Sequence, residues 1–432
     1  MKIYLDSIGC RLNQSEIEAY AIELRRKGHI IQSSPENADL ALINTCAVTS
    51  AAVSDSKQKI RQIQKTSSNG IIVTGCWSTL FPDEIPQHPG ILKQIPNKDK
   101  DQLINILFPD ESEQLDIEPI NRYPIPGAKF RTRSFLKVQD GCNNQCTFCI
   151  TTLARGEQRS RSIQEIHTYI QEYLLRNPEE ITNIQEIVLT GVHLGSWGQD
   201  LHPKLHLRDL VQSILDNFDI PRLRLSSLEP WDLDSTFFNL WKDPRLCRHI
   251  HLPLQSGSLS TLRRMARRTT PQKFSTLVEQ ARSAIPDVAI TTDIIAGFPG
   301  ETDAEFEETV LFVRNLSFAG GHVFTYSPRP GTAAIRLPDQ VPHPIRKERN
   351  AILRQILEDS KSEYHSRFID QTVSVLWESA TAMGPDGWQL SGLTDNYIRV
   401  HAIAPNYMWN QITKVHITGR NKLGLEGNVE DS

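Results

Sequence analysis

Short apolar runs and helical stretches alternate through the first quarter of the chain. The apolar runs cover residues 2–9, 40–46 and 71–76, and their lengths are typical of buried strands. Between them, residues 15–27 carry apolar side chains at helical spacing, and residues 50–65 form a polar stretch expected to be a helix. Strands that alternate with helices predict a parallel sheet with helices on both faces.

More strand-like runs follow in the middle of the chain, with helical stretches between most of them. Six such runs lie at residues 135–139, 186–192, 222–228, 249–254, 289–298 and 320–327. This pattern predicts a partial (β/α)6 barrel, whose functional loops follow the carboxyl ends of the strands. From about residue 367 the runs are short and separated by Gly, Pro and Asn, which predicts a small antiparallel barrel.

An acidic stretch at residues 108–119, bounded by prolines, predicts a linker between the first two parts of the chain. The 432 residues are therefore expected to be α/β in fold class and to form three domains. These are an N-terminal parallel α/β domain over residues 1–120, the partial barrel over 121–365 and the small β-barrel over 366–432.

Composition excludes several classes of protein. With 39% hydrophobic and 23% charged residues, the chain has enough apolar side chains for packed cores. Its net charge of -4 excludes a strongly basic field, so charge alone gives no argument for nucleic-acid binding. No run approaches the roughly 20 apolar residues of a membrane span, and the first residues lack a signal-peptide pattern. We therefore expect a cytoplasmic protein with no membrane partner.

Three cysteines, Cys10, Cys46 and Cys76, come directly after predicted strands of the first part. The carboxyl ends of parallel strands lie along one edge of a sheet, where open α/β sheets bind ligands. Three thiols that are distant in the sequence could therefore meet. The alternative is that they are three buried small hydrophobic side chains, because free cysteine packs well in cores.

Three further cysteines, Cys142, Cys146 and Cys149, form a C-x3-C-x2-C loop directly after a strand. Three thiolates on one tight loop can each bind one iron of a 4Fe-4S cluster, which leaves the fourth iron open to substrate or cofactor. Zinc is the alternative, but a structural zinc site usually needs four protein ligands, and no fourth is evident near this loop. The seventh cysteine, Cys247, matches neither set and is expected to be structural.

This loop is the signature of the radical S-adenosylmethionine (SAM) enzymes, and the chain resembles the radical-SAM methylthiotransferase family over nearly its full length. The matching segments are SIGCRLNQSE, INTCAVT, VTGC, DGCNNQCTFCI, ARGEQRSRS, LTGVHLGSWG, HLPLQSGS, MARRTT, DIIAGFPGET and FTYSPRPGTA. The C-terminal part resembles the RNA-binding TRAM domain of that family, although by residue count it is net acidic.

The resemblance implies SAM and two 4Fe-4S clusters as cofactors. Cys142, Cys146 and Cys149 would hold the SAM-binding cluster, while Cys10, Cys46 and Cys76 would hold an auxiliary cluster that carries sulfur. Cleavage of SAM would give a radical that removes hydrogen from an unactivated C–H bond, which a methylthio group then replaces. Such a bond is too weakly acidic for side-chain bases, so a cofactor must supply the chemistry.

Five other residues are implied to contact SAM. Phe148 would lie near the adenine, Thr190 and Gly191 would bind the amino group through their backbone, and Glu229 and Gln255 would contact the ribose or carboxylate. The alternative for each is a packing or turn residue.

Members of the family act on an adenosine beside the tRNA anticodon or on an aspartate of a ribosomal protein. The segments SIGCRLNQSEIE, NTCAVTSAAVSDSKQKIRQ and YSPRPGTAA resemble the branch that modifies threonylcarbamoyladenosine. Arg329 supports this branch, because a cation suits a nucleoside that bears a carboxylate. The alternatives are isopentenyladenosine, the ribosomal aspartate, or a non-catalytic iron–sulfur or zinc protein that binds RNA.

The implied partners are the anticodon stem-loop of tRNA and an electron donor such as a flavodoxin or ferredoxin. One dense basic run contains Arg263, Arg264, Arg267 and Arg268. We expect it to be either a solvated helix face or a contact to RNA phosphates.

Overall fold

The computed structural model describes residues 1–66, 70–109, 132–174, 184–384 and 387–430. The predicted linker at residues 108–119 lies outside the described residues from residue 110 onward, as does the domain boundary expected at residue 120. None of the described helices combines the length and the apolar character that a membrane span requires.

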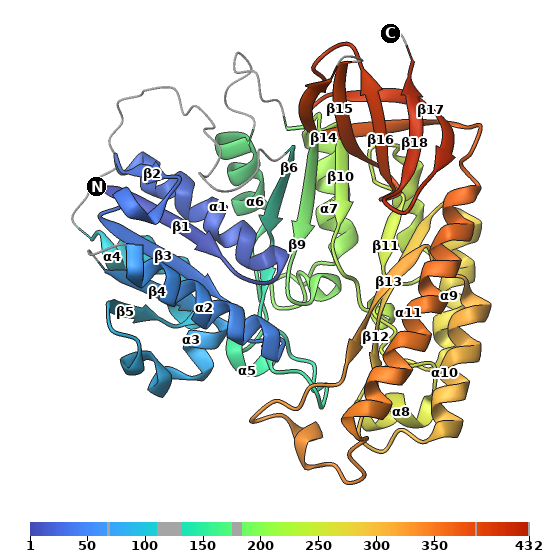
Figure 1. The fold of residues 1–432 in the computed structure, drawn as a ribbon, viewed down its shortest axis with the longest axis horizontal. Helices are drawn as coiled ribbons and strands as arrows, with labels where there is room; N and C mark the ends of the chain where they lie inside the picture. Colours follow the sequence, from blue (N-terminus) through green and yellow to red (C-terminus); the bar gives the residue numbers. More distant parts are fainter. Residues whose placement is uncertain (67–69, 110–131, 175–183, 385–386, 431–432) are drawn as a thin grey trace.

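The N-terminal part is a five-stranded parallel sheet in the order β2-β1-β3-β4-β5 (Figure 1). Its strands are β1 (Lys2–Ser7), β2 (Ile30–Gln32), β3 (Leu40–Thr45), β4 (Ile71–Gly75) and β5 (Ile91–Ile95). Its helices are α1 (Arg11–Arg26), α2 (Ser50–Thr66), α3 (Cys76–Leu80) and α4 (Leu103–Leu107). Apolar side chains of α1 and α4 pack on one face of the sheet, and those of α2 and α3 pack on the other. The predicted parallel sheet is confirmed, but the analysis of the sequence missed β2 and β5, which form its two edges.

The central part contains six parallel strands in two sheets that isolated bridges join. One sheet has the order β10-β9-β6 and the other β11-β12-β13, and parallel bridges from Leu223 to Leu246 and from Ser227 to His251 connect them. The strands are β6 (Arg133–Lys137), β9 (Glu186–Thr190), β10 (Arg222–Leu225), β11 (His249–His251), β12 (Ala289–Ala296) and β13 (Gly320–Thr325). The predicted partial (β/α)6 barrel is thereby confirmed.

Helices pack against the outer side of these strands and share one apolar core with them. They are α6 (Ile163–Tyr169), α7 (Leu207–Asn217), α9 (Pro271–Ala284), α10 (Asp303–Leu316) and α11 (His343–Ser366). Two short helices, α5 (Thr151–Arg155) and α8 (Leu259–Arg264), lie near the carboxyl ends of the strands. A small antiparallel ribbon, β7 (Gln139–Asp140) with β8 (Arg159–Ser160), brackets the C-x3-C-x2-C loop.

The C-terminal part is a closed barrel of five strands, drawn in red in Figure 1. They are β14 (Thr372–Gly384), β15 (Gly387–Thr394), β16 (Arg399–Ala404), β17 (Ile412–Arg420) and β18 (Leu425–Val429). The barrel has its own core around the fully buried Trp377. Its pairs are antiparallel, as predicted, with one exception: β16 and β18 are parallel, because β18 closes the barrel beside a strand that is not its neighbour in sequence.

Tyr397, in the turn between β15 and β16, anchors this barrel to the rest of the protein. Its ring stacks on His249 at 4.5 Å, and the guanidinium groups of Arg11, Arg133 and Arg224 lie 5.4, 6.0 and 5.1 Å from its centroid. Arg11 also donates a hydrogen bond to the hydroxyl. Burial raises the pKa of Tyr397, but the three nearby positive charges outweigh burial and lower this pKa below its usual value.

Arg224 at this junction forms a buried ion pair with Glu186, with 2.6 Å between Nε and Oε1 and both side chains 0% exposed. We expect Glu186→Gln to lower the free energy of unfolding by about 3 kcal/mol or more, because it leaves a buried charge without its partner. Denaturant unfolding checks this result. The control is Glu358→Gln, whose partner Lys361 is 3.4 Å away at the surface, where the loss should stay below about 1 kcal/mol. Equal unfolding midpoints for the two variants would contradict the prediction.

Candidate functional site

Cys10, Cys46 and Cys76 follow three neighbouring parallel strands of the N-terminal sheet. Cys10 precedes α1, Cys46 follows β3 and Cys76 begins α3. The pKa of the Cys46 thiol is raised to about 11, mainly by burial and in smaller part by the proximity of Cys10 and Cys76. A Cβ on Gly9 would lie 2.5 Å from the sulfur of Cys46, so only glycine allows this close approach. The three thiols therefore lie within electrostatic reach of one another.

Cys142, Cys146 and Cys149 lie on the loop between β7 and α5. The backbone of this loop is closed at its base, where the N–H of Cys142 donates to the carbonyl of Gly156 at 3.0 Å. Burial raises the pKa of Cys146 to about 11, and it also raises the pKa of Cys149. The raised pKa values mean that burial disfavours the thiolates, which are the forms that bind metal. A bound cation or a nearby positive charge is therefore needed to stabilise the deprotonated forms.

Arg267 supplies such a charge. Its Nη1 lies 3.9 Å from the sulfur of Cys146, and its guanidinium forms two hydrogen bonds with the carboxylate of Glu229, at 3.1 and 2.6 Å. Trp231 covers one side of the guanidinium at 4.4 Å. Glu229 thereby reaches the cysteine loop through Arg267, which the sequence analysis did not assign to the site.

The expectation for the basic run was wrong at one of its four positions, Arg267. The side chain of Arg267 is only 1% exposed, so it lies neither on a solvated face nor on a surface open to RNA. Arg264 donates to Glu305 at 3.0 Å. The run has no acidic residue of its own, but acidic side chains that are distant in sequence, Glu229 and Glu305, pair with it in the fold. Arg263 and Arg268 are exposed, as either expectation requires.

Phe148 lies at one end of an aromatic cluster. Its ring meets Phe298 edge-on, with 6.3 Å between centroids, and Tyr326 contacts the other side of Phe298 at 5.4 Å. Phe298 belongs to the glycine-rich segment after β12. This cluster provides a partly exposed apolar surface beside Cys149, of the kind on which a flat ring can pack.

Thr190 and Gly191 lie at the carboxyl end of β9, beside the base of the cysteine loop. The carbonyl of Thr190 accepts from the N–H of Val138 at 3.0 Å. A Cβ on Gly191 would lie 2.7 Å from Oε1 of Gln139, whose amide donates to the carbonyl of Gly141 at 2.7 Å. Gln255 is separate from this group: its backbone pairs with β12 and has a φ of 70°, and within the described residues no hydrogen bond joins its side chain to another candidate.

Arg329 lies with the N-terminal cysteines. Its side chain is buried, and Cys46 is near enough to act on its pKa, which burial lowers. Its Nε and Nη2 have no hydrogen-bond partner among the described residues. A buried guanidinium with two unpaired nitrogens is costly, and it is suited to an anionic ligand.

Cys247 is buried beside Glu186, with 3.8 Å between Sγ and Oε2. In the described part of the chain, no three His, Cys, Asp or Glu side chains stand ready-made as a metal site. The two sets of three thiols are thus identified as candidate metal ligands by their positions along the backbone and by their electrostatic influence on one another.

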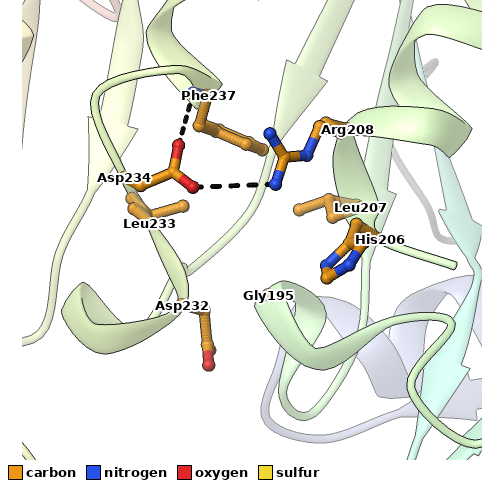
Figure 2. Close-up of a pocket in the computed structure, with 8 residues that line it drawn as sticks. All are labelled: Gly195, His206, Leu207, Arg208, Asp232, Leu233, Asp234 and Phe237. Atoms are coloured by element: carbon orange, nitrogen blue, oxygen red, sulfur yellow. Dashed lines mark hydrogen bonds and ion pairs between the residues drawn. The ribbon is translucent and has the colours of Figure 1, made fainter. Parts of the chain in front are cut away.

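Figure 2 shows a pocket beside the candidate site, lined by Gly195, His206, Leu207, Arg208, Asp232, Leu233, Asp234 and Phe237. None of the candidate residues lines it. Asp232 links it to the cysteine loop, because its Oδ2 lies 2.5 Å from Nε2 of His193, and His193 hydrogen-bonds to Asn144 at 3.3 Å. This pocket therefore lies next to the cysteine loop, and no cysteine lines it.

Comparison with known proteins matches two family models to the chain. Residues 2–95 match the "Uncharacterized protein family UPF0004", and residues 136–313 match the "Radical SAM superfamily". A solved radical S-adenosylmethionine methyltransferase, TsrM from Kitasatospora setae, shares the fold at a TM-score of 0.53 and 14% identity, covering 77% of each chain. The fold and the cysteine loop together define a radical SAM enzyme.

Curated relatives match nearly end to end. Threonylcarbamoyladenosine tRNA methylthiotransferase MtaB from Bacillus subtilis is 33% identical, over 95% of this chain and 92% of the relative, and its Thermotoga maritima namesake is 34% identical, over 98% and 95%. A tRNA-2-methylthio-N(6)-dimethylallyladenosine synthase from Ehrlichia canis is 30% identical, over 99% of both chains. The chain belongs to the radical-SAM methylthiotransferase family. It is a transferase whose cofactors include SAM and a 4Fe-4S cluster.

Exposure of the thiols predicts their order of alkylation. In the metal-free protein near neutral pH, iodoacetamide should modify the exposed Cys10 at least about tenfold faster than Cys46 or Cys247. The latter two are buried, and burial raises their pKa values to about 11 and about 12. Mass spectrometry of peptides sampled over time checks this order. After loading with iron and sulfide, Cys10 should become protected; unchanged reactivity would count against its role as a ligand.

Proposed function

We propose that this protein is a tRNA methylthiotransferase that converts N6-threonylcarbamoyladenosine beside the anticodon to its 2-methylthio derivative. Full-length similarity to relatives named for this activity supports the reaction and the tRNA substrate. The observation that carries the choice of nucleoside is the buried Arg329 guanidinium, which lies within electrostatic reach of Cys46 and has two nitrogens that no described residue pairs with.

The two sets of thiols are the proposed ligands of two clusters. Cys142, Cys146 and Cys149 would hold the SAM-binding cluster, and Cys10, Cys46 and Cys76 an auxiliary cluster. When bound, these groups supply a radical able to attack an unactivated C–H bond and the sulfur that replaces the hydrogen. Two positive charges lie near these thiols: Arg267 faces Cys146, and Arg155 is close enough to Cys10 and Cys76 to interact with them electrostatically.

The residues proposed to bind SAM surround the cysteine loop. Phe148, in edge contact with Phe298, offers an apolar ring surface for the adenine. Thr190 and Gly191, at the carboxyl end of β9, are the proposed backbone contacts to the amino group. The carboxylate of Glu229, oriented by Arg267, and the amide of Gln255 are the proposed polar contacts to the ribose and the amino-acid end.

Arg329 distinguishes the substrates by charge. The threonylcarbamoyl group carries a carboxylate, which can accept two hydrogen bonds from one guanidinium. The isopentenyl group carries no charge and would leave the guanidinium unpaired. A ribosomal aspartate also has a carboxylate, but the full-length relatives are named for tRNA substrates, which favours tRNA.

The proposed partners follow from the reaction. The anticodon stem-loop brings the nucleoside, and the C-terminal barrel, which resembles a TRAM domain, would contact the RNA. Cleavage of SAM requires one electron, so a donor such as a flavodoxin or ferredoxin is needed. Since tRNA is the substrate, we place the enzyme in the cytoplasm.

We expect expression of this protein in a host that lacks 2-methylthio-threonylcarbamoyladenosine to produce that nucleoside, because the host tRNA already carries its precursor. Mass spectrometry of digested tRNA is the measurement, and a Cys149→Ala variant is the inactive control. If the isopentenyl derivative appears instead, the reaction stands and the nucleoside is wrong. If neither appears, the ribosomal aspartate is tested next, followed by SAM cleavage as the test of a non-catalytic protein.

Arg329→Ala should lower kcat/KM for the threonylcarbamoyl RNA by about 10- to 100-fold, the cost of losing a charge-assisted hydrogen bond. Cleavage of SAM in the absence of RNA should be unaffected. Arg336→Ala is the matched control, because this arginine lies in the same segment and is exposed. Equal methylthiolation by both variants would remove Arg329 from the substrate site.

A further inference from the structure

Helix α5 joins the cysteine loop to the N-terminal sheet. It begins two residues after Cys149 and packs against α3, whose first residue is Cys76 (Figure 1). Ala154 of α5 is buried in the same apolar core as Cys76 and Trp77. The two cysteine sites are thus joined through a short helix pair and not only through the long chain between them.

The side-chain amide of Asn97 bridges the same two helices. Its Nδ2 donates to the sulfur of Cys76 at 3.7 Å and to the carbonyl of Ala154 at 2.8 Å. Asn97 is buried, so water does not compete for these contacts.

Arg155, the last residue of α5, donates hydrogen bonds to three other side chains. Its Nη1 donates to Glu16 at 2.9 Å and to Asp140 at 3.0 Å, and its Nη2 donates to Oδ1 of Asn13 at 2.7 Å. Glu16 and Asn13 belong to α1, which starts directly after Cys10, whereas Asp140 stands two residues before Cys142. The side chain of Arg155 is 1% exposed. One guanidinium therefore forms hydrogen bonds both with residues that follow Cys10 and with a residue that precedes Cys142, and so connects the two cysteine sites.

Asn13 extends this connection to the other strand ends. Its Nδ2 donates to the carbonyl of Ile8 at 2.8 Å and to that of Thr45 at 3.1 Å. Ile8 lies two residues before Cys10, and Thr45 directly precedes Cys46. Arg155 thus reaches the backbone that positions all three N-terminal cysteines, either through Asn13 or through the contact between α5 and α3.

We propose that Arg155 is a positioning residue that fixes the separation of the two cluster sites, so that both act on one nucleoside. This inference rests on the proposed function, in which each set of thiols holds a cluster. Two groups that act on one substrate atom must keep their geometry, because misplacement by about 1 Å can cost about 100-fold in rate. The planar guanidinium of arginine can donate hydrogen bonds to three acceptors at once. Lysine has one nitrogen on a flexible side chain and cannot form the same set of hydrogen bonds.

The test uses the full-length protein loaded with iron and sulfide, as wild type and as Arg155→Lys. Three quantities are measured: iron per chain, the distance between the reduced clusters by pulsed electron paramagnetic resonance, and methylthiolated nucleoside formed per 5′-deoxyadenosine released. In Arg155→Lys we expect iron content and SAM cleavage within about twofold of wild type, a broader distance distribution, and a product ratio about 10- to 100-fold lower. A wild-type ratio with a wild-type distance distribution would overturn the inference.

Arg224→Lys is the matched control. Arg224 is equally buried and also pairs with a glutamate, but it lies in β10 and its other hydrogen bonds go to the carbonyls of Thr394 and Asp395 beside the terminal barrel. The Arg224→Lys variant should have a lower free energy of unfolding and an unchanged product ratio. If its product ratio falls as far as that of Arg155→Lys, lost stability is the cause of the lower ratio. If Arg155→Lys does not fold, the Asn97→Ala variant replaces it in the test. The inference then requires a lower product ratio for Asn97→Ala, and an unchanged product ratio overturns the inference.

The wild-type protein separates the two hypotheses. If it binds only about four iron atoms per chain, one cluster is missing and the proposed function fails before Arg155 is considered. If it binds about eight and forms the product, the result for Arg155→Lys bears on the positioning role alone.

Discussion

The carboxylate of Glu16 is buried at the centre of the molecule, and its charge must be balanced there. Arg155 comes from α5, Lys100 from beyond the last strand of the N-terminal sheet, and Lys137 from the first strand of the central barrel, at 2.9, 2.6 and 3.4 Å. Burial raises the pKa of Glu16, but these three cations outweigh burial and hold the pKa well below its usual value. A buried charge without partners costs several kcal/mol, so the N-terminal sheet and the barrel are bound to one arrangement.

That arrangement lets two independent parallel sheets present thiols to a common region. In each sheet the backbone delivers cysteine directly after a strand, where neighbouring strand ends converge. The N-terminal set is assembled from three separate loops, whereas the central set comes from one loop closed by a short β-ribbon. Neither sheet could set the spacing between the two groups of thiols. The contacts across their boundary supply that spacing.

Much of this architecture could be predicted from local pattern. The six barrel strands, the cysteines after β3 and β4, and the terminal barrel all follow from apolar periodicity and turn residues. The edge strands β2 and β5 were missed because both are only partly buried and β2 is also short, so neither shows an apolar run. Arg267 was misjudged for a different reason: the charged residues near it in sequence are all basic, and Glu229, Trp231 and Pro253 meet it only in the folded chain. Contacts between distant loops leave no periodic signal, and for that reason the ion pairs around the thiols were missed.

The placement of Tyr397 also bears on how this protein can change over evolutionary time. Its ring fills the space among Arg11, Arg133 and Arg224, which belong to the other two parts of the chain. A variant that lost the terminal barrel would leave three guanidinium groups gathered around an empty position, where they would repel one another and attract anions. The terminal barrel is therefore not a freely exchangeable module. A lineage that discarded or replaced it would first have to lose the arginines that now surround the tyrosine.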